Sequence, residues 1–476
     1  MSRRRFLAMS LGTAAAATLA ACSSPRGTAT VVPSSSPTGP VAQEIRLRAR
    51  EAQIDLGGRA ATAWTFGDRV PGAAIRAKAG ERVRITVTND LPEETSVHWH
   101  GLAVPNPMDG VPGVTTPAIA SGTSFTYDFV VPDAGTHWFH PHTGLQLDTG
   151  LYAPFIVEDP GETARYDHDW VLMLDDWTQG VGQDPQQIFD GLVSAGQRSD
   201  QGGMMDMGGM DMGSDGGDVT YPLYLINGRA AADPDVLRVK PGDRIRVRII
   251  NAAADTIFTV AVGGHRMTIT HTDGYPVQPV DAQSLRIGMG ERYDVVVQAG
   301  DGVFPVVAQP AGKSGYAMAV LRSAAGRLPA SPIPAELSAY PAGADVLLSD
   351  ESVRLPRSDP QQTYDLVLSG SMAPYVWTIN GDTYDRAEPL TVQAGQTVRL
   401  RLSNMSMMTH PVHLHGHTFQ VGPAGGTGPR KDTVLLPPMT RAEVDLVADN
   451  PGRWMLHCHN AYHAEAGMMT RLDYTT

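Results

Sequence analysis

Hydrophobic and polar residues alternate in short runs along most of the chain, which is the pattern of half-buried β-strands. The runs are rich in Val, Ile and Leu, and 50 glycines and 36 prolines interrupt the chain. The 3.6-residue period of a long helix is missing outside an apolar segment near the N-terminus. The pattern predicts an all-β protein whose body contains no long helix.

One strand pattern occurs three times. The segments IRAKAGERVRITVTN, LRVKPGDRIRVRIIN and LTVQAGQTVRLRLSN begin at residues 75, 237 and 390 and align without a gap. Each contains a glycine turn, an alternating strand and a final asparagine. Their separation is close to the ~150 residues of one domain, which predicts three consecutive antiparallel β-sandwiches. We call residues 43–160, 161–325 and 346–476 the first, middle and third modules, and 326–345 the linker.

The N-terminus has the features of a targeting segment. The opening SRRRFLA resembles a twin-arginine export signal, and the apolar run that follows is too short to span a membrane. The run ends in LAAC, which resembles a bacterial lipoprotein box whose cysteine, Cys22, carries lipid; an ordinary signal with a chance cysteine is the alternative. Residues 23–42 predict a flexible tether. We expect residues 1–22 to direct export, after which lipid anchors the chain at the outer face of the cell membrane.

Charge and cysteine content argue against a nucleic-acid-binding protein and against a disulfide in the mature chain. A net charge of −13 and a pI near 5.6 argue against a nucleic-acid partner. Cys458 is the only cysteine after Cys22, so it has no disulfide partner in the mature chain. Its neighbours His457 and His459 suggest a metal site instead.

Four His-x-His pairs follow the register of the repeat. HWH and HLH begin nine residues after the final asparagine of the first and third copies, and HPH and HCH begin five residues after a glycine in the same two modules. Residues i and i+2 of a strand lie on one face, so each pair can direct both imidazoles to one point. The eight histidines are His98, His100, His140, His142, His413, His415, His457 and His459.

The middle module lacks these ligands. Val260, Val262, Val307 and Gln309 occupy the corresponding positions, which predicts a spacer domain without metal ligands. A single His-x-His is typical of a surface pair or of core histidines, but four pairs in register are not. Eight converging imidazoles exceed the ligands of one ion, so they predict a polynuclear cluster of zinc, copper, iron or nickel.

A further ligand set surrounds the solitary cysteine. Cys458, His463 and Met468 are close in sequence, and His410 heads the stretch HPVHLHGH. Two histidines, one cysteine and an axial methionine form the ligand set of a blue-copper electron-transfer site. The Cys458 thiolate would therefore bind one copper ion while its two neighbours bind another site.

The motifs HWHG, HWFHPH, HPVHLHGH and HCHNAYHAEAGM resemble the four signature motifs of the multicopper oxidases, over about residues 43–476. With its N-terminal signal, the chain resembles bacterial laccase-like copper-resistance oxidases. The resemblance implies three cupredoxin-like Greek-key β-sandwich domains and four copper ions. It implies a type 1 copper at His410, Cys458, His463 and Met468, a type 2 copper at His98 and His413, and a type 3 pair at His100, His140, His142, His415, His457 and His459.

The resemblance also implies the reaction. A reductant gives single electrons to the type 1 copper, and the electrons pass through Cys458 to His457 and His459 and the cluster, where O2 is reduced to water. Asp109, in PMDGVPG, occupies the position of a family carboxylate that relays protons; a simple Asp-Gly turn is the alternative. Some relatives have an acid directly after the second type 1 histidine, where this chain has Ala464 followed by Glu465.

Methionines suggest the substrate. The stretch MMDMGGMDM contributes Met204, Met205, Met207, Met210 and Met212, within an insert at 203–217. Thioethers select cuprous copper, although a low-complexity loop is the alternative. Met408, after Met405 and Met407, matches a substrate-copper methionine of bacterial cuprous oxidases, but Ser406 replaces their acid.

These observations predict an exported, monomeric oxidase in copper resistance that oxidises cuprous copper, ferrous iron and phenols with O2. The alternatives are a copper-sequestering lipoprotein without turnover and a general phenol-oxidising laccase. A two-domain copper nitrite reductase is disfavoured, because those proteins lack histidines on both sides of the cysteine. The other histidines are predicted to be structural or surface groups, namely His137, His168, His265, His271 and His417.

Overall fold

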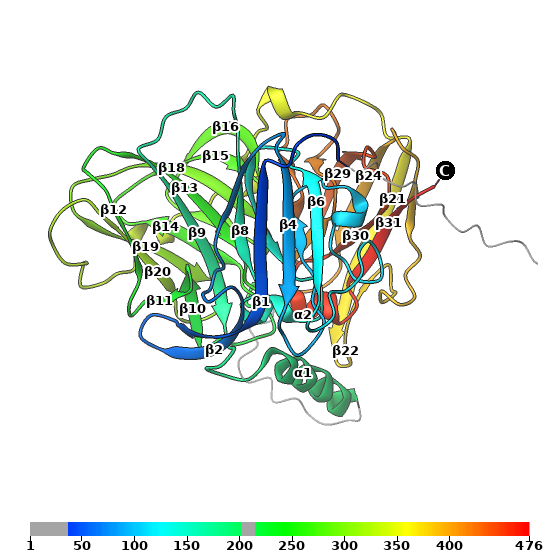
Figure 1. Cartoon of the computed structure of the whole chain (residues 1–476), viewed down its shortest axis with the longest axis horizontal. Helices are drawn as coiled ribbons and strands as arrows, with labels where there is room; N and C mark the ends of the chain where they lie inside the picture. Colours follow the sequence, from blue (N-terminus) through cyan, green and yellow to red (C-terminus); the bar gives the residue numbers. More distant parts are fainter. Residues whose placement is uncertain (1–36, 201–214, 476) are drawn as a thin grey trace, which may run out of the picture.

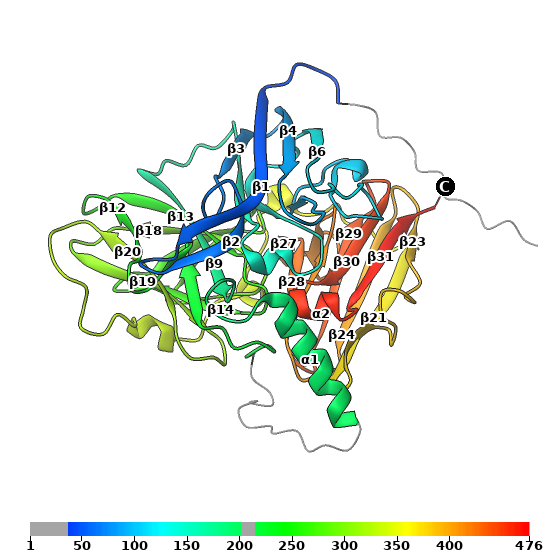
Figure 2. The same cartoon turned by 60° about the horizontal axis from the view of Figure 1, so that its bottom comes forward.

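The computed structural model describes residues 37–200 and 215–475, which form six β-sheets, two in each module (Figure 1). In this view the middle module (green) is on the left, the third module (orange and red) on the right and the first (blue and cyan) between them, whereas the turned view shows the first module above the other two (Figure 2). The N-terminal signal with Cys22 and the five methionines between 204 and 212 lie outside the described residues. This architecture confirms the all-β prediction.

The first module is a sandwich of two four-stranded sheets with strand orders β2-β1-β4-β6 and β3-β8-β7-β5. Side chains of both sheets meet in one apolar core, where Val83 and Val87 of β4 pack with Trp99 of β5 and Phe139 of β7. The strands are β1 (Gln43–Asp55), β2 (Ala60–Phe66), β3 (Ile75–Lys78), β4 (Arg82–Asn89), β5 (His98–His100), β6 (Ser124–Val130), β7 (Gly135–His140) and β8 (Ala153–Glu158).

The middle module has sheets of seven and five strands, ordered β11-β10-β9-β13-β18-β15-β16 and β12-β20-β19-β14-β17. Its strands are β9 (His168–Trp177), β10 (Leu223–Ile226), β11 (Arg229–Ala230), β12 (Asp235–Arg238), β13 (Arg244–Asn251), β14 (Phe258–Val262), β15 (Met267–Thr272), β16 (Tyr275–Ala282), β17 (Leu285–Ile287), β18 (Arg292–Gln298), β19 (Val303–Pro310) and β20 (Ala317–Arg322).

The third module has sheets of six and five strands, ordered β22-β21-β24-β29-β26-β27 and β23-β31-β30-β25-β28. Its strands are β21 (Gln362–Met372), β22 (Tyr375–Ile379), β23 (Leu390–Val392), β24 (Thr397–Asn404), β25 (His410–Leu414), β26 (Phe419–Val421), β27 (Arg430–Lys431), β28 (Thr433–Leu436), β29 (Arg441–Val447), β30 (Arg453–Cys458) and β31 (Met469–Tyr474). The short helix α2 (Ala461–Glu465) follows β30.

The repeated sequence forms the same strand in each module. The strands β4, β13 and β24 each pair in parallel with the first strand of their own module, and each ends at the repeat's asparagine. That asparagine is fully buried: the Asn89 amide donates to the carbonyls of Glu93 (2.7 Å) and Ile119 (2.8 Å), and its oxygen accepts from the backbone of Leu91 (2.9 Å). Asn251 and Asn404 repeat these contacts. The asparagine therefore satisfies the polar backbone of the loop that leaves each strand.

One helix was not expected from the sequence pattern. The helix α1 (Pro185–Asp200) has 16 residues, so the prediction that the body lacks a long helix is wrong. The Asp184 side chain accepts from the backbone N–H of Gln186 at 2.9 Å, and a proline occupies the first helical position. Its apolar residues, at 188, 189, 192 and 193, pack against the core of the third and middle modules, beside β22 (Figure 2).

Shorter helical turns connect the strands. The 3-10 turns are η1 (Asn106–Met108), η2 (Gln146–Thr149), η3 (Ala335–Ser338), η4 (Ala344–Val346) and η5 (Glu351–Val353). Within 37–200 and 215–475, no helix has both the length and the apolar content of a membrane-crossing segment.

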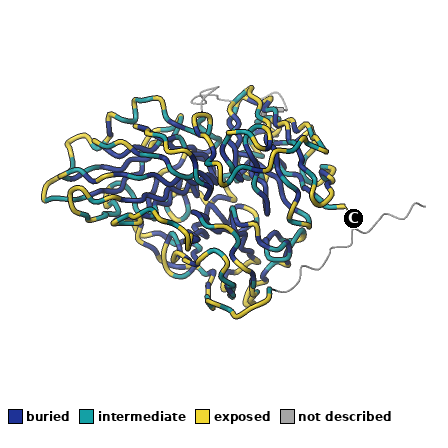
Figure 3. The backbone as a smooth tube through the Cα atoms, turned by 90° about the horizontal axis from the view of Figure 1, so that it is seen from above, coloured by how far each residue is buried: buried dark blue, intermediate teal, exposed yellow. Residues whose placement is uncertain are grey.

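The modules are joined by shared apolar cores. One apolar cluster runs from the middle module into the third, and a second joins β1 and β2 of the first module to β9 and β10 of the middle module. Buried backbone consequently fills the region where the modules meet (Figure 3). This packing fixes the positions of side chains from different modules relative to each other.

The buried asparagines should contribute strongly to stability. We expect Asn89→Ala to lower the free energy of unfolding by about 1–3 kcal/mol, because the loop carbonyls that it satisfies would lose their donor. Denaturant unfolding of the variant measures the loss. Thr86→Ala is the control, since Thr86 lies on the same strand and pairs only with Thr126 at 3.0 Å near the surface; an equal loss in both variants would contradict the role given to Asn89.

Candidate metal centres

The strand register brings the four His-x-His pairs together. In the first module His98 of β5 lies opposite His140 of β7, and in the third module His413 of β25 lies opposite His457 of β30. The two modules then meet through these pairs: the ring centroids of His140 and His459 are 5.2 Å apart, and those of His142 and His457 are 4.9 Å apart. All eight imidazoles predicted to form a polynuclear site thus lie in one cluster at the junction of the first and third modules.

The cluster is buried, and burial lowers the pKa of seven of its imidazoles. All eight rings are buried except that of His142, which is partly exposed. Burial and neighbouring imidazoles hold the pKa values of seven of them below the usual value; these are His100, His140, His142, His413, His415, His457 and His459. Neutral imidazole is the form that binds metal ions.

One nitrogen of most rings is fixed by a protein oxygen. Nδ1 of His98 donates to the carbonyl of Asp109 (3.0 Å), Nδ1 of His140 to that of Pro141 (2.9 Å), and Nδ1 of His413 to that of Asp432 (2.9 Å). Nε2 of each of these three rings is buried and has no hydrogen-bond partner among the described residues.

The remaining free nitrogens converge. Nε2 of His457 lies 3.0 Å from Nε2 of His415 and 3.4 Å from Nε2 of His142. Buried polar atoms are rarely left unpaired, so unpartnered lone pairs directed at common points fit metal ions. The groups whose ligand atoms lie within 4.8 Å include His98 with His413 and His415, and His142 with His415 and His457.

Asp109 links the two modules at this cluster. Its Oδ1 lies 3.1 Å from Nδ1 of His98, and its Oδ2 lies 3.1 Å from Nδ1 of His415. The carboxylate is buried at the end of η1, next to the turn at Gly110 (φ 87°). Asp109 therefore occupies a turn and also holds one imidazole from each module.

A separate group surrounds Cys458. Its Sγ lies 3.6 Å from Nδ1 of His410 and 3.7 Å from Nδ1 of His463, and those two nitrogens are 3.1 Å apart. All three residues are buried. Backbone hydrogen bonds hold buried Met468 beside the other residues, since its N–H donates to the carbonyl of His463 (3.0 Å) and its carbonyl accepts from Cys458 (3.0 Å).

The outward nitrogens of the two histidines are also occupied. Nε2 of His410 lies 2.7 Å from the hydroxyl of Ser406, and Nε2 of His463 lies 3.1 Å from Oδ2 of Asp218. The amide oxygen of Asn460 accepts from the backbone N–H of His463 at 3.1 Å and caps α2. Trp377 covers the His463 ring, with centroids 4.1 Å apart.

Strand alternation separates these two groups. Cys458 lies on one face of the end of β30, while its neighbours His457 and His459 join the histidine cluster on the other. Nδ1 of His457 donates to the Cys458 carbonyl at 2.8 Å. One short piece of chain therefore connects the thiol to the cluster.

A cleft of about 200 Å³ reaches the cluster between the first and third modules. Its walls include His140, His142, His457 and His459 together with Val114 and Leu147. Glu465 lies at its rim, where partial desolvation raises the pKa of the carboxyl. Small molecules can reach the imidazoles by this route.

The remaining residues singled out from the sequence lie outside both metal-ligand groups or outside the described part of the chain. Met408 is half-buried and packs against the core, whereas Met405 and Met407 are 52% and 49% exposed. The candidate metal groups among the described residues contain none of His137, His168, His265, His271 and His417. His168 contacts Asp243 (2.9 Å), and His417 contacts the Tyr474 hydroxyl (2.6 Å).

Comparison with known proteins identifies the class. Profiles described as multicopper oxidase match residues 48–162, 168–326 and 356–476. The chain is 49% identical over 435 residues to multicopper oxidase MmcO of Mycobacterium tuberculosis, which covers 90% of this chain and 86% of the relative. It is 30% identical to a copper resistance protein A homolog of Pseudomonas syringae pv. tomato, covering 98% of both.

Solved structures show the same fold. The laccase of Botrytis aclada has a TM-score of 0.74 and 28% identity, covering 92% of this chain and 88% of that one. The multicopper oxidase Fet3p, which functions in iron import, has a TM-score of 0.78 and 20% identity over 91% and 90% of the two chains.

The chain belongs to the multicopper oxidase family and is an oxidoreductase. The family binds four copper ions, one of type 1, one of type 2 and a type 3 pair, and the histidine groups described above fit such sites.

Several residues at these sites were not predicted from the sequence. Ser406 and Asp218 contact the histidines beside Cys458, and Asp432 contacts His100 at 3.2 Å. Asp218 follows the methionine-rich insert, and Asp432 precedes an ordinary strand, so neither has a recognisable motif. Their roles depend on contacts across the fold, which a pattern of residues does not encode.

Replacement of the cysteine tests the first group. Cys458→Ser should remove the blue absorption, because thiolate-to-copper charge transfer causes it, and should abolish oxidase activity. Copper analysis should find one ion fewer per chain than in the parent, since the eight imidazoles are unchanged. A parent enzyme that is fully loaded with copper but colourless would be incompatible with a blue-copper site here.

A variant of the cluster tests the second group. His457→Ala should abolish O2 uptake while the blue copper remains and can still be reduced, because His457 is not part of the group formed by His410, Cys458 and His463. The loss should exceed the roughly 10- to 100-fold cost of losing a group that only orients a ligand. His417→Ala is the control, since His417 is buried but outside the cluster; full turnover by His457→Ala would place O2 reduction elsewhere.

Proposed function

We propose that this multicopper oxidase oxidises cuprous copper, and also ferrous iron and phenols, in copper resistance at the outer face of the cell membrane. The observation that carries the proposal is the thiol–imidazole group of His410, Cys458 and His463. This group is joined through β30 to the histidine cluster, and Asp218, which follows the methionine-rich segment, contacts it. Similarity to copper resistance protein A homologues supports the physiological role.

We assign the ions to ligands as follows. His410, Cys458, His463 and Met468 hold the type 1 copper, and His98 and His413 hold the type 2 copper. The type 3 pair is held by His100, His140, His142, His415, His457 and His459. The free nitrogens of His98, His140 and His413, and the convergence of those of His142, His415 and His457, support this assignment.

When bound, copper supplies one-electron oxidation of the reductant at the type 1 site and four-electron reduction of O2 to water at the cluster. The protein supplies the connection between the sites, since Cys458 is adjacent in sequence to His457 and His459. Burial of Cys458 and Met468 keeps water away from the type 1 position, and the cleft gives O2 a route to the cluster.

Protons for water formation are assigned to two carboxyl groups. Asp109 contacts His98 and His415 inside the cluster, so it can hold a proton beside the site of O2 reduction. Glu465 lies at the rim of the cleft, where desolvation raises the pKa of its carboxyl. We assign to Glu465 the role of the acid that some relatives have at the position of Ala464.

Electrons are proposed to arrive through the edge of His463. The carboxylate of Asp218 accepts from His463 at 3.1 Å and also from the hydroxyl of Tyr375 at 2.7 Å. A carboxylate there can attract a cationic reductant or accept the proton of a phenol. This second possibility favours a general phenol-oxidising laccase as the alternative function.

The methionine-rich insert is proposed to collect cuprous copper. On one side of it α1 packs on β22, which bears Trp377 over His463; on the other side Asp215 contacts Thr409 and forms an ion pair with Arg286 at 2.6 Å. Asp215, which follows the methionines of the insert, therefore lies beside Thr409, the neighbour of His410, and exposed Met405 and Met407 extend the thioether surface there. Soft sulfur ligands favour cuprous over ferrous ions.

Export and anchoring rest on the sequence of the N-terminus. We propose that the twin-arginine segment directs export, that Cys22 carries lipid as the only membrane attachment, and that the protein acts as a monomer. A storage protein without turnover is the binding-class alternative. O2 uptake on cuprous ion by the copper-loaded protein distinguishes the two, because storage consumes no O2.

Conversion of the insert methionines to leucine tests the substrate. With Met204, Met205, Met207, Met210 and Met212 all replaced by Leu, the KM for cuprous ion should rise by about tenfold, which corresponds to about 1.4 kcal/mol of binding. Oxidation of ferrous ion and of a bulky phenol should not change, because His463 and Asp218 are intact. Steady-state O2 consumption at equal copper loading measures all three reactions, and unchanged kinetics on cuprous ion would leave only the laccase alternative.

A further inference from the structure

The middle module, expected to be only a spacer, reaches the histidine cluster through the loop between β17 and β18. Gly290 in this loop has a φ of 85°, and a Cβ atom there would lie 2.9 Å from Cδ2 of His459 and 3.0 Å from Cε1 of His100. Such approaches are shorter than real Cβ contacts, so only glycine fits without displacing a ring. The backbone of the middle module therefore packs directly against two imidazoles of the cluster.

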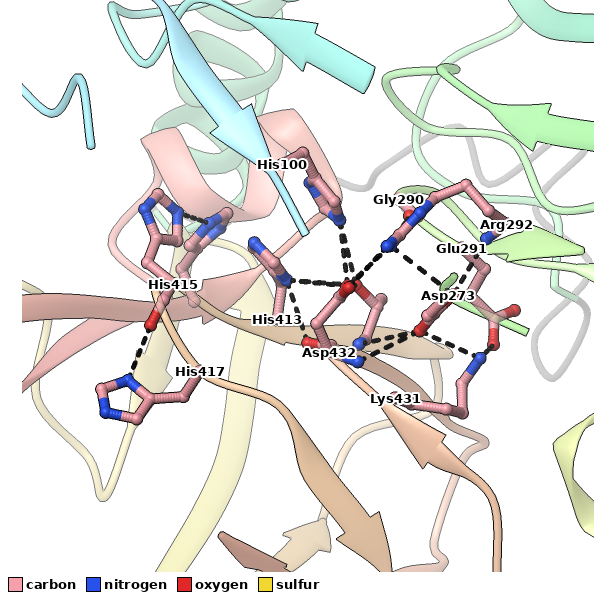
Figure 4. A network of polar contacts seen from close by, with 12 residues as sticks. His100, Asp273, Gly290, Glu291, Arg292, His413, His415, His417, Lys431 and Asp432 are labelled. Atoms are coloured by element: carbon pink, nitrogen blue, oxygen red, sulfur yellow. Dashed lines mark hydrogen bonds and ion pairs between the residues drawn. The ribbon is translucent and has the colours of Figure 1, made fainter. Parts of the chain in front are cut away.

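Arg292, two residues further on, joins all three modules. Its Nη1 and Nη2 donate to Oδ1 (2.7 Å) and Oδ2 (2.6 Å) of Asp432 in the third module, and its Nε donates to the carbonyl of Thr136 (3.0 Å) in the first (Figure 4). Both charged side chains are fully buried. A Cβ atom at Gly101, the glycine of HWHG, would lie 2.2 Å from Nη2, so this glycine leaves the space that the guanidinium fills.

Asp432 in turn contacts two imidazoles of the cluster. Its Oδ1 lies 3.2 Å from Nε2 of His100 and 3.4 Å from Nδ1 of His413, whose Nδ1 also donates to the Asp432 carbonyl at 2.9 Å. Because these oxygens act as acceptors, His100 carries its hydrogen on Nε2, whereas His413 carries it on Nδ1. The nitrogens left for metal are Nδ1 of His100 and Nε2 of His413, and neither has a hydrogen-bond partner within the described residues.

The backbone of Asp432 is also held by the middle module. Oδ2 of Asp273 accepts from the backbone N–H of Asp432 (3.2 Å) and of Thr433 (3.1 Å). The adjacent Lys431 forms buried ion pairs with Asp273 (3.1 Å) and Glu291 (3.0 Å). Residues 431–433 of the third module are therefore fixed by charged groups of a module that supplies none of the proposed copper ligands.

We propose that Arg292 is a positioning residue for the trinuclear copper site. By holding both oxygens of Asp432, it sets the orientation and the tautomers of His100 and His413, one a proposed type 3 ligand and the other a proposed type 2 ligand. The inference rests on the ligand assignment given under the proposed function. The type 1 group has no contact with this network in the described residues, so its copper should not depend on Arg292.

Two substitutions of Arg292 separate the effect of its positive charge from that of its two parallel hydrogen bonds to Asp432. Arg292→Met removes both, while Arg292→Lys keeps a cation that cannot bind two carboxylate oxygens in parallel. Copper-loaded proteins are compared by copper content, by the electron paramagnetic resonance signal of type 2 copper, and by blue absorption. We expect Arg292→Met to weaken retention of trinuclear copper by about 10- to 100-fold during dialysis against a chelator, and Arg292→Lys to recover part of it. Blue absorption should remain at the parent level in both.

A matched control removes another buried arginine of the middle module. Arg246 donates to Oδ2 of Asp294 at 2.6 Å and pairs with Glu162 at 2.9 Å, but it does not contact Asp432 or a proposed ligand. Arg246→Met should lower the unfolding temperature yet keep the parent's type 2 signal. Gly290→Ala tests the same contact of the middle module with the cluster while Arg292 is unchanged. The added methyl group should displace His100 or His459 and so alter the type 2 copper signal.

The outcomes are distinct. A type 2 signal and copper retention identical to the parent in Arg292→Met would overturn the positioning role. Parallel loss of blue absorption and type 2 copper in this variant would also overturn it, since that pattern indicates general destabilisation. If the parent itself holds no type 2 copper, the proposed ligand assignment fails instead.

Discussion

The structure depends on the convergence of eight imidazoles, donated by two modules, in a buried space where their free nitrogens face one another. Burial lowers the pKa of seven of these rings, and several of the buried ring nitrogens have no hydrogen-bond partner among the described residues. Copper ions held by these residues would supply the missing partners, and ligands from both modules would then share the same site. The apolar contacts between modules are therefore a condition of the chemistry, since a small shift of one sandwich would separate the two halves of the ligand set.

The parts of the site that the sequence predicted are those that follow from local geometry. A two-residue period places His98 and His100, or His457 and His459, on one face of a strand, and it sends Cys458 to the other. The three asparagines could be recognised because each recurs at the end of the repeated strand and bonds only to loops of its own module. Similarity to a known family then supplied the roles that geometry alone leaves open.

What could not be predicted depends on contacts between distant residues. Arg292 and Asp432 are 140 positions apart, and neither lies in a motif, so only the folded chain shows that they meet. The helix α1 was missed because its apolar residues form a short stripe in a sequence dominated by strand patterns, although Asp-Pro at its start is a helix signal. The middle module looked like a spacer because a search for ligands finds none in it, while its contribution is to hold ligands of other modules.

The size of the cleft beside the histidine cluster limits which molecules can reach the imidazoles. With a volume of about 200 Å³, it is smaller than the roughly 300–1,000 Å³ of sites that enclose drug-sized ligands, whereas O2 and water pass easily. The side chains of His463 and Asp218 are buried, and neither residue is among those that line the cleft. In the proposed function, O2 would reach the cluster through the cleft and the reductant would give its electrons at His463, so the two would meet different residues, with Cys458 between them.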